Sequence, residues 1–190
     1  KGLRLINPSG LTDNTGIGLS VEKDGDTQVV RSLSSKTGMR YIFKVPHDYF
    51  VHYESSGVNG KRLIVENLRA ELDVSVNYNG VELSGVTGPM AIHSVYKSIE
   101  ANFESVSQEG SISLYSVYQD VDVTVPSSTK AEFKLKVSYG DLYSDLDLEY
   151  PKGSDGMKNL SGKNMGAMAN GGGVSFTIKS GYKIVYLRKK

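Results

Sequence analysis

The sequence predicts an all-β fold in which short strands stack in parallel, and two features support this prediction. First, one phrase recurs four times: an alternation of apolar and polar residues leads to a tyrosine, two turn residues follow, and the alternation resumes. Second, apolar residues nowhere keep the i, i+3, i+4, i+7 spacing of a helix for three turns. The tyrosines of the four phrases are Tyr78, Tyr96, Tyr118 and Tyr139, at intervals of 18, 22 and 21 residues. A period of about 20 residues made of strands indicates a stacked solenoid, because one such unit cannot bury its own apolar face.

The parity of residues within each copy assigns them to faces. Side chains alternate along a strand, so every second residue points to the same side. The apolar residues share the parity of the tyrosine, as in Leu72, Val74 and Val76 before Tyr78. We therefore expect the four tyrosines to lie inside the fold, directly above one another at the strand spacing of about 4.8 Å. Their role in this prediction is structural.

Composition excludes several classes of function. The 190 residues carry 22 basic and 21 acidic side chains, so no strong field favours nucleic acid as a partner. Cysteine is absent, which excludes disulfides, zinc–thiolate sites and thiol nucleophiles. No apolar run approaches the roughly 20 residues that a transmembrane helix needs. We expect no cofactor.

The chain divides into four segments within one predicted solenoid domain, 1–190. Residues 1–57 are expected to form N-terminal coils with a cap that could be truncated, and residues 58–150 form the regular repeats. Residues 151–169 are rich in Gly, Ser, Asn and Lys and are interpreted as a surface excursion. Alternation returns in residues 170–190, which predicts C-terminal strands.

Several stretches of the sequence are informative as a set, namely 2–7, 13–20, 65–79, 85–89, 94–96, 116–118, 121–126, 170–173 and 184–189. Together they resemble a bacterial family of exported, adhesin-like domains of unknown function. The resemblance covers nearly the whole chain and implies a right-handed, single-stranded β-helix-like solenoid, export through a signal peptide that has been removed, and a periplasmic or cell-surface location. The family brings no catalytic residues.

Glu82, Glu100 and Asp122 occupy the same outward position in three successive copies. Copies stacked in register would bring these carboxylates into a column, one strand spacing apart. A solvated face tolerates such neighbours, because in water they repel by only about 1 kcal/mol. The alternative is a binding site for a cation or another ligand, although calcium requires six to eight oxygen ligands and usually a preorganised loop.

Other polar residues give weaker signals. His47, His52 and His93 lack the spacing of metal ligands, so we predict no metal site. Lys134 and Lys136 on an outward face are interpreted as charges that keep a sheet edge soluble.

The sequence therefore predicts an exported, non-enzymatic interaction or scaffolding domain of the bacterial cell envelope, whose partner is an unidentified envelope protein or glycan. A second hypothesis is a protein that binds or cleaves glycans with the outward acids Glu82, Glu100, Asp122 and Asp145. A third is a structural spacer within an envelope assembly.

Overall fold

A computed structural model describes residues 10–33, 39–58, 60–150 and 164–190. Contacts between Cα atoms divide the chain into two compact units, Lys1–Phe43 and Lys44–Lys190, where the sequence predicted one domain. The first thirteen residues of the expected surface excursion, 151–163, lie outside the described residues.

The first unit contains an antiparallel hairpin of β1 (Leu19–Asp24) and β2 (Thr27–Ser32). Gly25 in its turn has φ +57°, a left-handed conformation that glycine adopts without steric cost. Ahead of the hairpin, the Asp13 carboxylate accepts hydrogen bonds from the backbone N–H groups of Thr15, Gly16 and Gly18 at 2.8–3.0 Å. These bonds, that from Gly18 above all, lower the pKa of Asp13.

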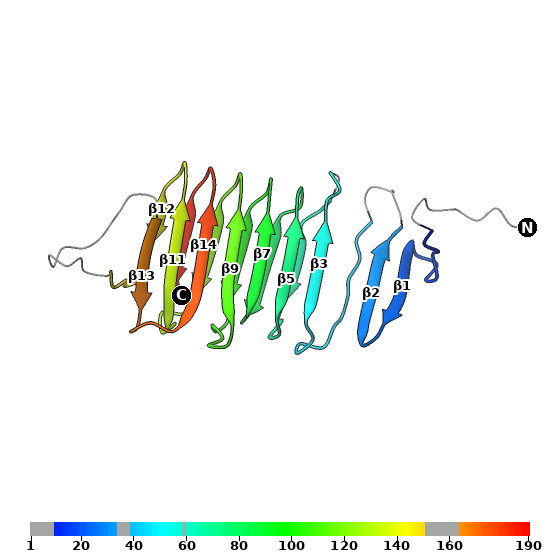
Figure 1. The fold of residues 1–190 in the computed structure, drawn as a ribbon, viewed down its shortest axis with the longest axis horizontal. Coiled ribbons are helices and arrows are strands. Elements are labelled where there is room, and N and C mark those ends of the chain that lie inside the picture. The colour runs from blue at the N-terminus through cyan, green and yellow to red at the C-terminus, as the bar shows by residue number, and fades with distance from the viewer. Residues whose placement is uncertain (1–9, 34–38, 59, 151–163) are drawn as a thin grey trace, which may run out of the picture. The chain divides into compact units, whose positions relative to one another are not determined.

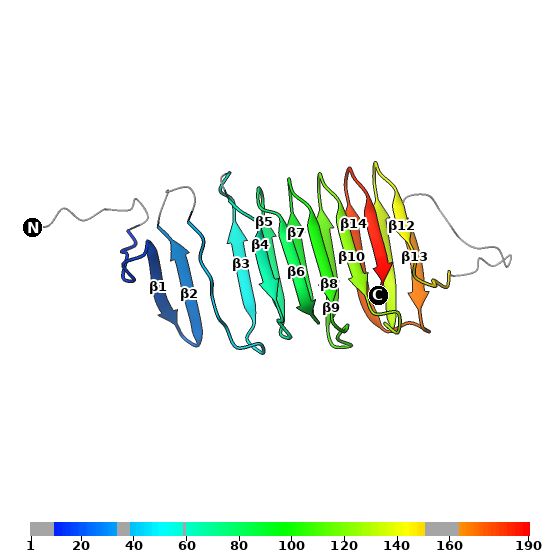
Figure 2. The same ribbon diagram turned by 180° about the vertical axis from the view of Figure 1, so that it is seen from behind.

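The second unit consists of two sheets (Figures 1 and 2). All regular elements among the described residues are strands, so the all-β class is confirmed. The seven-stranded sheet contains β3 (Val51–Ser55), β5 (Leu72–Val76), β7 (Met90–Ser94), β9 (Ser111–Ser116), β11 (Ala131–Val137), β13 (Asn164–Ala169) and β14 (Val174–Ser180). The six-stranded sheet contains β4 (Leu63–Glu66), β6 (Val81–Val86), β8 (Ile99–Phe103), β10 (Val121–Val125), β12 (Leu142–Ser144) and β15 (Val185–Lys189).

Each copy of the repeated phrase contributes one strand to each of the two sheets. Each copy places the strand before its tyrosine in the seven-stranded sheet and the strand after it in the six-stranded sheet. From β3 to β9, and from β4 to β10, neighbouring strands pair in parallel. The chain order breaks at the other end, because β14 lies between β9 and β11 and β15 lies between β10 and β12.

The predicted right-handed, single-stranded β-helix-like solenoid is therefore wrong. The strands form a two-sheet sandwich, and the seven-stranded sheet is mixed because β13 runs antiparallel to β11. Residues 164–169, which were assigned to the surface excursion, are β13 itself. The repeats indicated which strands pair with their successors, but they did not indicate that β14 and β15 return between earlier strands of the two sheets.

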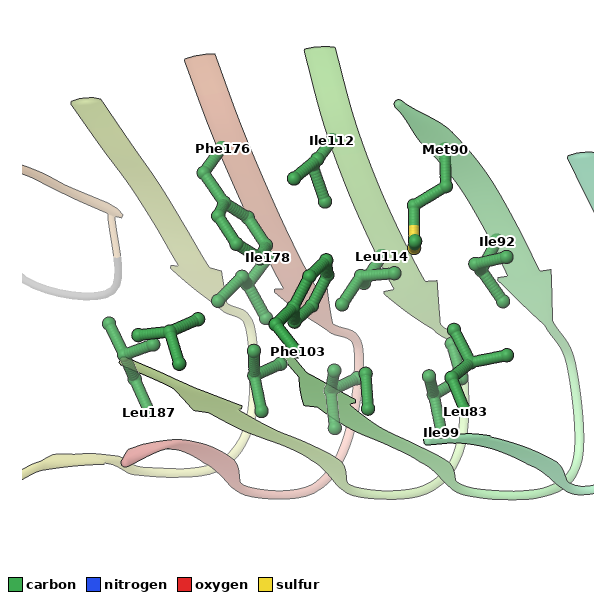
Figure 3. Close-up of a cluster of buried hydrophobic side chains, with 14 of the residues drawn as sticks. Leu83, Met90, Ile92, Ile99, Phe103, Ile112, Leu114, Phe176, Ile178 and Leu187 are labelled. Carbon is green, nitrogen blue, oxygen red and sulfur yellow. The ribbon is translucent and has the colours of Figure 1, made fainter. Parts of the chain in front are cut away.

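The core lies between the two sheets. In the central strands of both sheets alternate residues are buried, as in Phe133 and Leu135 of β11, while the residues between them are more exposed. Phe103 of β8 meets Phe176 of β14 edge-on, with ring centroids 5.4 Å apart, and Phe176 also contacts Phe133 at 5.2 Å. Figure 3 shows Phe103 pointing across the gap toward the strand that carries Phe176 and Ile178. The three phenylalanines thus join the two sheets where β14 enters.

A row of buried serines closes the core beneath the corners. Ser94, Ser116 and Ser180 are the last residues of β7, β9 and β14 and lie in register on neighbouring strands. The Ser94 and Ser116 hydroxyls donate to the carbonyl oxygen of Lys97 at 2.7 and 3.1 Å, and Ser116 Oγ accepts from the N–H of Gln119 at 3.1 Å. These hydroxyls satisfy backbone groups that the bend would otherwise leave without partners.

We expect Ser116→Ala to lower the free energy of unfolding by about 1–2 kcal/mol. The substitution removes the acceptor of the Gln119 N–H and one hydrogen-bond donor to the Lys97 carbonyl oxygen. Urea unfolding followed by circular dichroism measures this loss. Ser75→Ala is the matched control: Ser75 is exposed on the outer face of β5, so the change should stay within about 0.5 kcal/mol. Equal effects of the two substitutions would contradict the role given to the buried hydroxyl.

Candidate functional site

Five tyrosines form a continuous stack at the corner where the chain leaves the seven-stranded sheet. Each follows its strand by two residues, so the parallel pairing of the strands brings the rings one above another. The centroid distances in the order of the stack are 4.8, 5.2, 5.1 and 5.0 Å, and the interplanar angles are between 6° and 19°. This tyrosine row consists of Tyr78, Tyr96, Tyr118, Tyr182 and Tyr139.

The tyrosine row lies at the surface and not in the interior, contrary to the expectation from parity. Tyr96, Tyr118, Tyr139 and Tyr182 are 43%, 40%, 71% and 49% exposed. The alternation of faces holds only while the backbone stays extended, and the chain bends immediately after the serine row. The last inward residue before the bend is a serine at three of the five corners and a valine, Val76 or Val137, at the other two, and the tyrosine two residues later lies at the surface.

Tyr182 is the member of the row that the sequence reasoning missed. It separates Tyr118 from Tyr139, because β14 lies between β9 and β11. The signal was present locally, since Ser180-Gly-Tyr182 has the same serine and tyrosine spacing as Ser94-Val-Tyr96 and Ser116-Val-Tyr118. It was overlooked because residue 182 does not follow Tyr139 by one period.

The three outward carboxylates do lie on neighbouring strands in register. Glu82 pairs with Glu100 and Glu100 with Asp122, at the Cα positions of β6, β8 and β10. Arg62 lies against the first two, with Nη1 2.8 Å from Glu82 Oε2 and Nη2 3.3 Å from Glu100 Oε1. The hydrogen bond to Glu82 is the main reason that the pKa of Arg62 is raised. The positive charge of Arg62 thus lies between Glu82 and Glu100, at the position where the sequence suggested a bound cation as an alternative.

Asp122 has its own arginine. Arg188 contacts both carboxylate oxygens of Asp122, at 2.8 and 3.0 Å, and this hydrogen bonding raises the pKa of Arg188. The guanidinium carbon also lies 4.7 Å from the centre of the Tyr186 ring. Tyr186 follows Asp122 in register, and Tyr143 of β12 stacks on Tyr186 at 5.7 Å, so the carboxylate column ends in two aromatic rings.

The fourth proposed acid, Asp145, is separated from this column. Its Oδ1 accepts a hydrogen bond from the backbone N–H of Lys189 at 2.7 Å, which ties the chain after β12 to β15. Strands β15 and β10 lie between β12 and the strand that carries Glu100. Glu82, Glu100 and Asp122 are thus neighbours that are paired with arginines, and Asp145 does not join them on an adjacent strand.

Arg62→Gln should lower the free energy of unfolding by only about 0.5 kcal/mol, because the Arg62, Glu82 and Glu100 side chains are all more than 40% exposed and solvent screens the ion pairs. The removal leaves two neighbouring carboxylates that repel each other, so the loss should grow as salt is reduced. Thermal melting at low and high salt measures both effects. Lys23→Gln, which removes an exposed charge elsewhere, should show neither effect, and calcium should not restore the melting temperature.

The histidines do not converge on a metal position. His52 lies 3.0 Å from Asp73 Oδ2 and 3.2 Å from Glu54 Oε1 at an exposed position, and His93 stacks on Tyr115 with centroids 5.1 Å apart. Within the residues that the structure describes, no group of three or more His, Cys, Asp and Glu side chains has the arrangement of a metal site.

None of the described segments forms a helix with the length and apolar character that a bilayer crossing requires.

Comparisons with known proteins give one informative result. No protein-family model matches this sequence, and no curated protein matches it. A crystal structure from Clostridium sporogenes, described as that of a putative cell adhesion protein, has a similar fold, with a TM-score of 0.55. The likeness covers 90% of this chain and 76% of the other, with 9% sequence identity. At that identity the comparison shows a shared fold alone.

Proposed function

We propose that this protein is an exported, non-enzymatic interaction domain of the bacterial cell envelope, and that the tyrosine row is the surface through which it binds an envelope protein or glycan. The observation that carries the proposal is the exposure of the row: four of its five rings are at least 40% accessible. The shared fold with a protein described as adhesive supports the same class of function.

The geometry of the row suits recognition. Tyrosine is enriched in binding interfaces because it offers a large contact area together with a polar hydroxyl. Stacking on two neighbours already restricts each inner ring, so little rotational freedom is lost when a partner binds. The row extends over five neighbouring strands, about 20 Å at the usual strand spacing. An extended partner, such as a polymer or a strand-like segment, matches a surface of this shape.

Two observations favour binding over the alternatives from the sequence. Glycan cleavage would need convergent acids, whereas Glu82, Glu100 and Asp122 are held in ion pairs with arginines and Asp145 binds a backbone N–H. A structural spacer gives no reason for a line of exposed aromatic rings, which proteins otherwise tend to cover.

The test compares wild-type protein with Tyr96→Ala/Tyr118→Ala on a glycan array and with immobilised envelope fractions. We expect the double variant to lose binding by tenfold or more, because hot-spot aromatic residues each contribute on the order of 2 kcal/mol. Tyr49→Ala is the control, since Tyr49 is 61% exposed but does not belong to the row. Tyr96→Phe/Tyr118→Phe keeps the stack and separates the role of the hydroxyls from that of the rings. Binding that survives the loss of both rings, in a protein shown to be folded, would refute the proposed surface.

A further inference from the structure

Three lysines gather on the outer face of the seven-stranded sheet. Lys136 of β11 and Lys179 of β14 are in register on neighbouring parallel strands, and Lys134 precedes Lys136 on the same face. All three side chains are exposed, while Leu135 and Ile178 between them point into the core. The structure thus places two exposed lysines at paired positions of neighbouring strands and a third two residues away on the same face. This set, Lys134, Lys136 and Lys179, is the lysine cluster.

The lysine cluster costs free energy of folding, and its lysines do not protect a sheet edge as the sequence suggested. Like charges opposite each other on neighbouring strands are destabilising. The interpretation of Lys134 and Lys136 as charges that protect a sheet edge is wrong, because β11 lies inside the sheet between β13 and β14. Within the described ranges no ion pair involves any of the three lysines, in contrast to Arg62 and Arg188 on the other sheet.

The lysines surround an open hollow of about 340 Å³. Gly166 of β13, opposite Lys134, forms part of its lining and has no side chain to fill it. A Cβ atom built on Gly166 would meet nothing within 4 Å, so the space above this residue is open. The lining also offers the hydroxyl of Thr177 and the amide of Asn164.

The row that contains Lys136 and Lys179 continues with groups that form hydrogen bonds. Lys179 is in register with Tyr115 of β9, and Tyr115 with His93 of β7, whose ring stacks on that of Tyr115. The surface is therefore a nearly straight strip across four strands, cationic at one end and furnished with hydroxyl, phenol and imidazole groups beyond it. The net charge of the whole chain is +1, so the positive character is a property of this strip.

We propose that this strip binds a linear acidic glycan, with uronate carboxylates at Lys136 and Lys179 and sugar hydroxyls hydrogen-bonded to Thr177, Asn164 and Tyr115. Charge complementarity requires an anionic ligand, and the neighbouring hydroxyl and amide groups match one that is rich in hydroxyls. A flat, extended strip fits a polymer better than a compact anion. The inference rests on the proposed binding function and adds a second surface, with a defined ligand class, to the tyrosine row.

The experiment measures binding of oligogalacturonate by isothermal titration, with the fully methyl-esterified, uncharged oligomer as the paired probe. Wild-type protein should bind the acidic oligomer at least tenfold more tightly, and this preference should shrink as ionic strength rises. Lys136→Gln/Lys179→Gln should abolish the preference. Lys23→Gln/Lys61→Gln removes the same number of exposed charges elsewhere and should leave it unchanged.

Gly166 provides a second, independent pair of variants. Gly166→Glu places a carboxylate in the hollow beside the lysines and should weaken binding at least tenfold, while Gly166→Gln fills the same volume without charge and should weaken it less. Both fit sterically, because the position is open, and unchanged melting temperatures would verify that they fold. Equal losses from Glu and Gln would overturn the electrostatic part of the inference.

The outcomes separate this inference from the proposed function. If oligogalacturonate does not bind, or if single-stranded DNA of equal charge binds equally well through the lysine cluster, the acidic-glycan inference fails. The proposed function would still stand if envelope binding depended on Tyr96 and Tyr118. Conversely, oligogalacturonate binding that is lost in the lysine variants, together with envelope binding that is indifferent to the tyrosines, would support the strip and refute the tyrosine row.

Discussion

Replacing Phe176 by alanine is expected to lower the free energy of unfolding by about 3–5 kcal/mol, the largest loss that we predict for a single substitution. The Phe176 side chain is fully buried and contacts Phe103 on the opposite sheet and Phe133 on the neighbouring strand. Truncation removes apolar contacts on two sides and leaves a cavity that rigid strands cannot close. For a domain of this size the loss corresponds to a fall in melting temperature of about 10 °C.

Chemical denaturation with a circular dichroism readout measures this effect, and two variants control for it. Phe176→Leu keeps most of the buried volume and should lose less than half as much. Phe50→Ala removes an equally large ring that is 58% exposed, and should change the stability by no more than about 0.5 kcal/mol. A loss at Phe176 no greater than that at Phe50 would show that the two sheets do not pack as described.

Gly140→Ala should be destabilising by about 1–3 kcal/mol, because the new methyl group would overlap the backbone carbonyl of Lys183. Gly140 directly follows Tyr139, and Lys183 follows Tyr182, so the two corners lie against each other beneath the stacked rings. A carbonyl group held by the surrounding chain cannot swing away as the end of a flexible side chain could. The two corners must therefore separate.

The matched control for this substitution is Gly166→Ala. Gly166 has open space around its Cα, and its backbone conformation suits any residue, so alanine there should be neutral or add about 0.5 kcal/mol by restricting the unfolded chain. Urea midpoints of the two variants give the comparison directly. If Gly140→Ala proves as stable as Gly166→Ala, the close approach of the two corners is refuted.

The sequence could predict the parts of the fold that repeat. The alternation in residues 72–83 placed Leu72, Val74 and Val76 in the core, where they are almost completely buried, because burial on one face of a strand leaves a period of two. The constant spacing also indicated that Glu82, Glu100 and Asp122 share one register, as they do. Local periodicity carries this information without any knowledge of distant contacts.

The remaining features depend on contacts between residues far apart in the chain. Arg188 follows Asp122 by 66 residues, so no spacing rule links these two partners, whereas Arg62 precedes Glu82 by 20 residues, one period of the repeat. The positions of β13, β14 and β15 depend on which strands the returning chain can pair with. For the same reason the lysine cluster was not recognised, since Lys179 lies 43 residues after Lys136 and meets it only through the placement of β14.

The placement of β14 and β15 has a consequence for the order in which the molecule assembles during synthesis. Strands β3 to β10 can add to one another as they are made, each docking on the one before. Strands β11 and β12 cannot, because their parallel neighbours on the growing side are encoded by residues 174–189. A nascent chain that ends at residue 150 should therefore carry β11 and β12 without their parallel neighbours, and these two strands can complete their pairing only after residues 174–189 have been made.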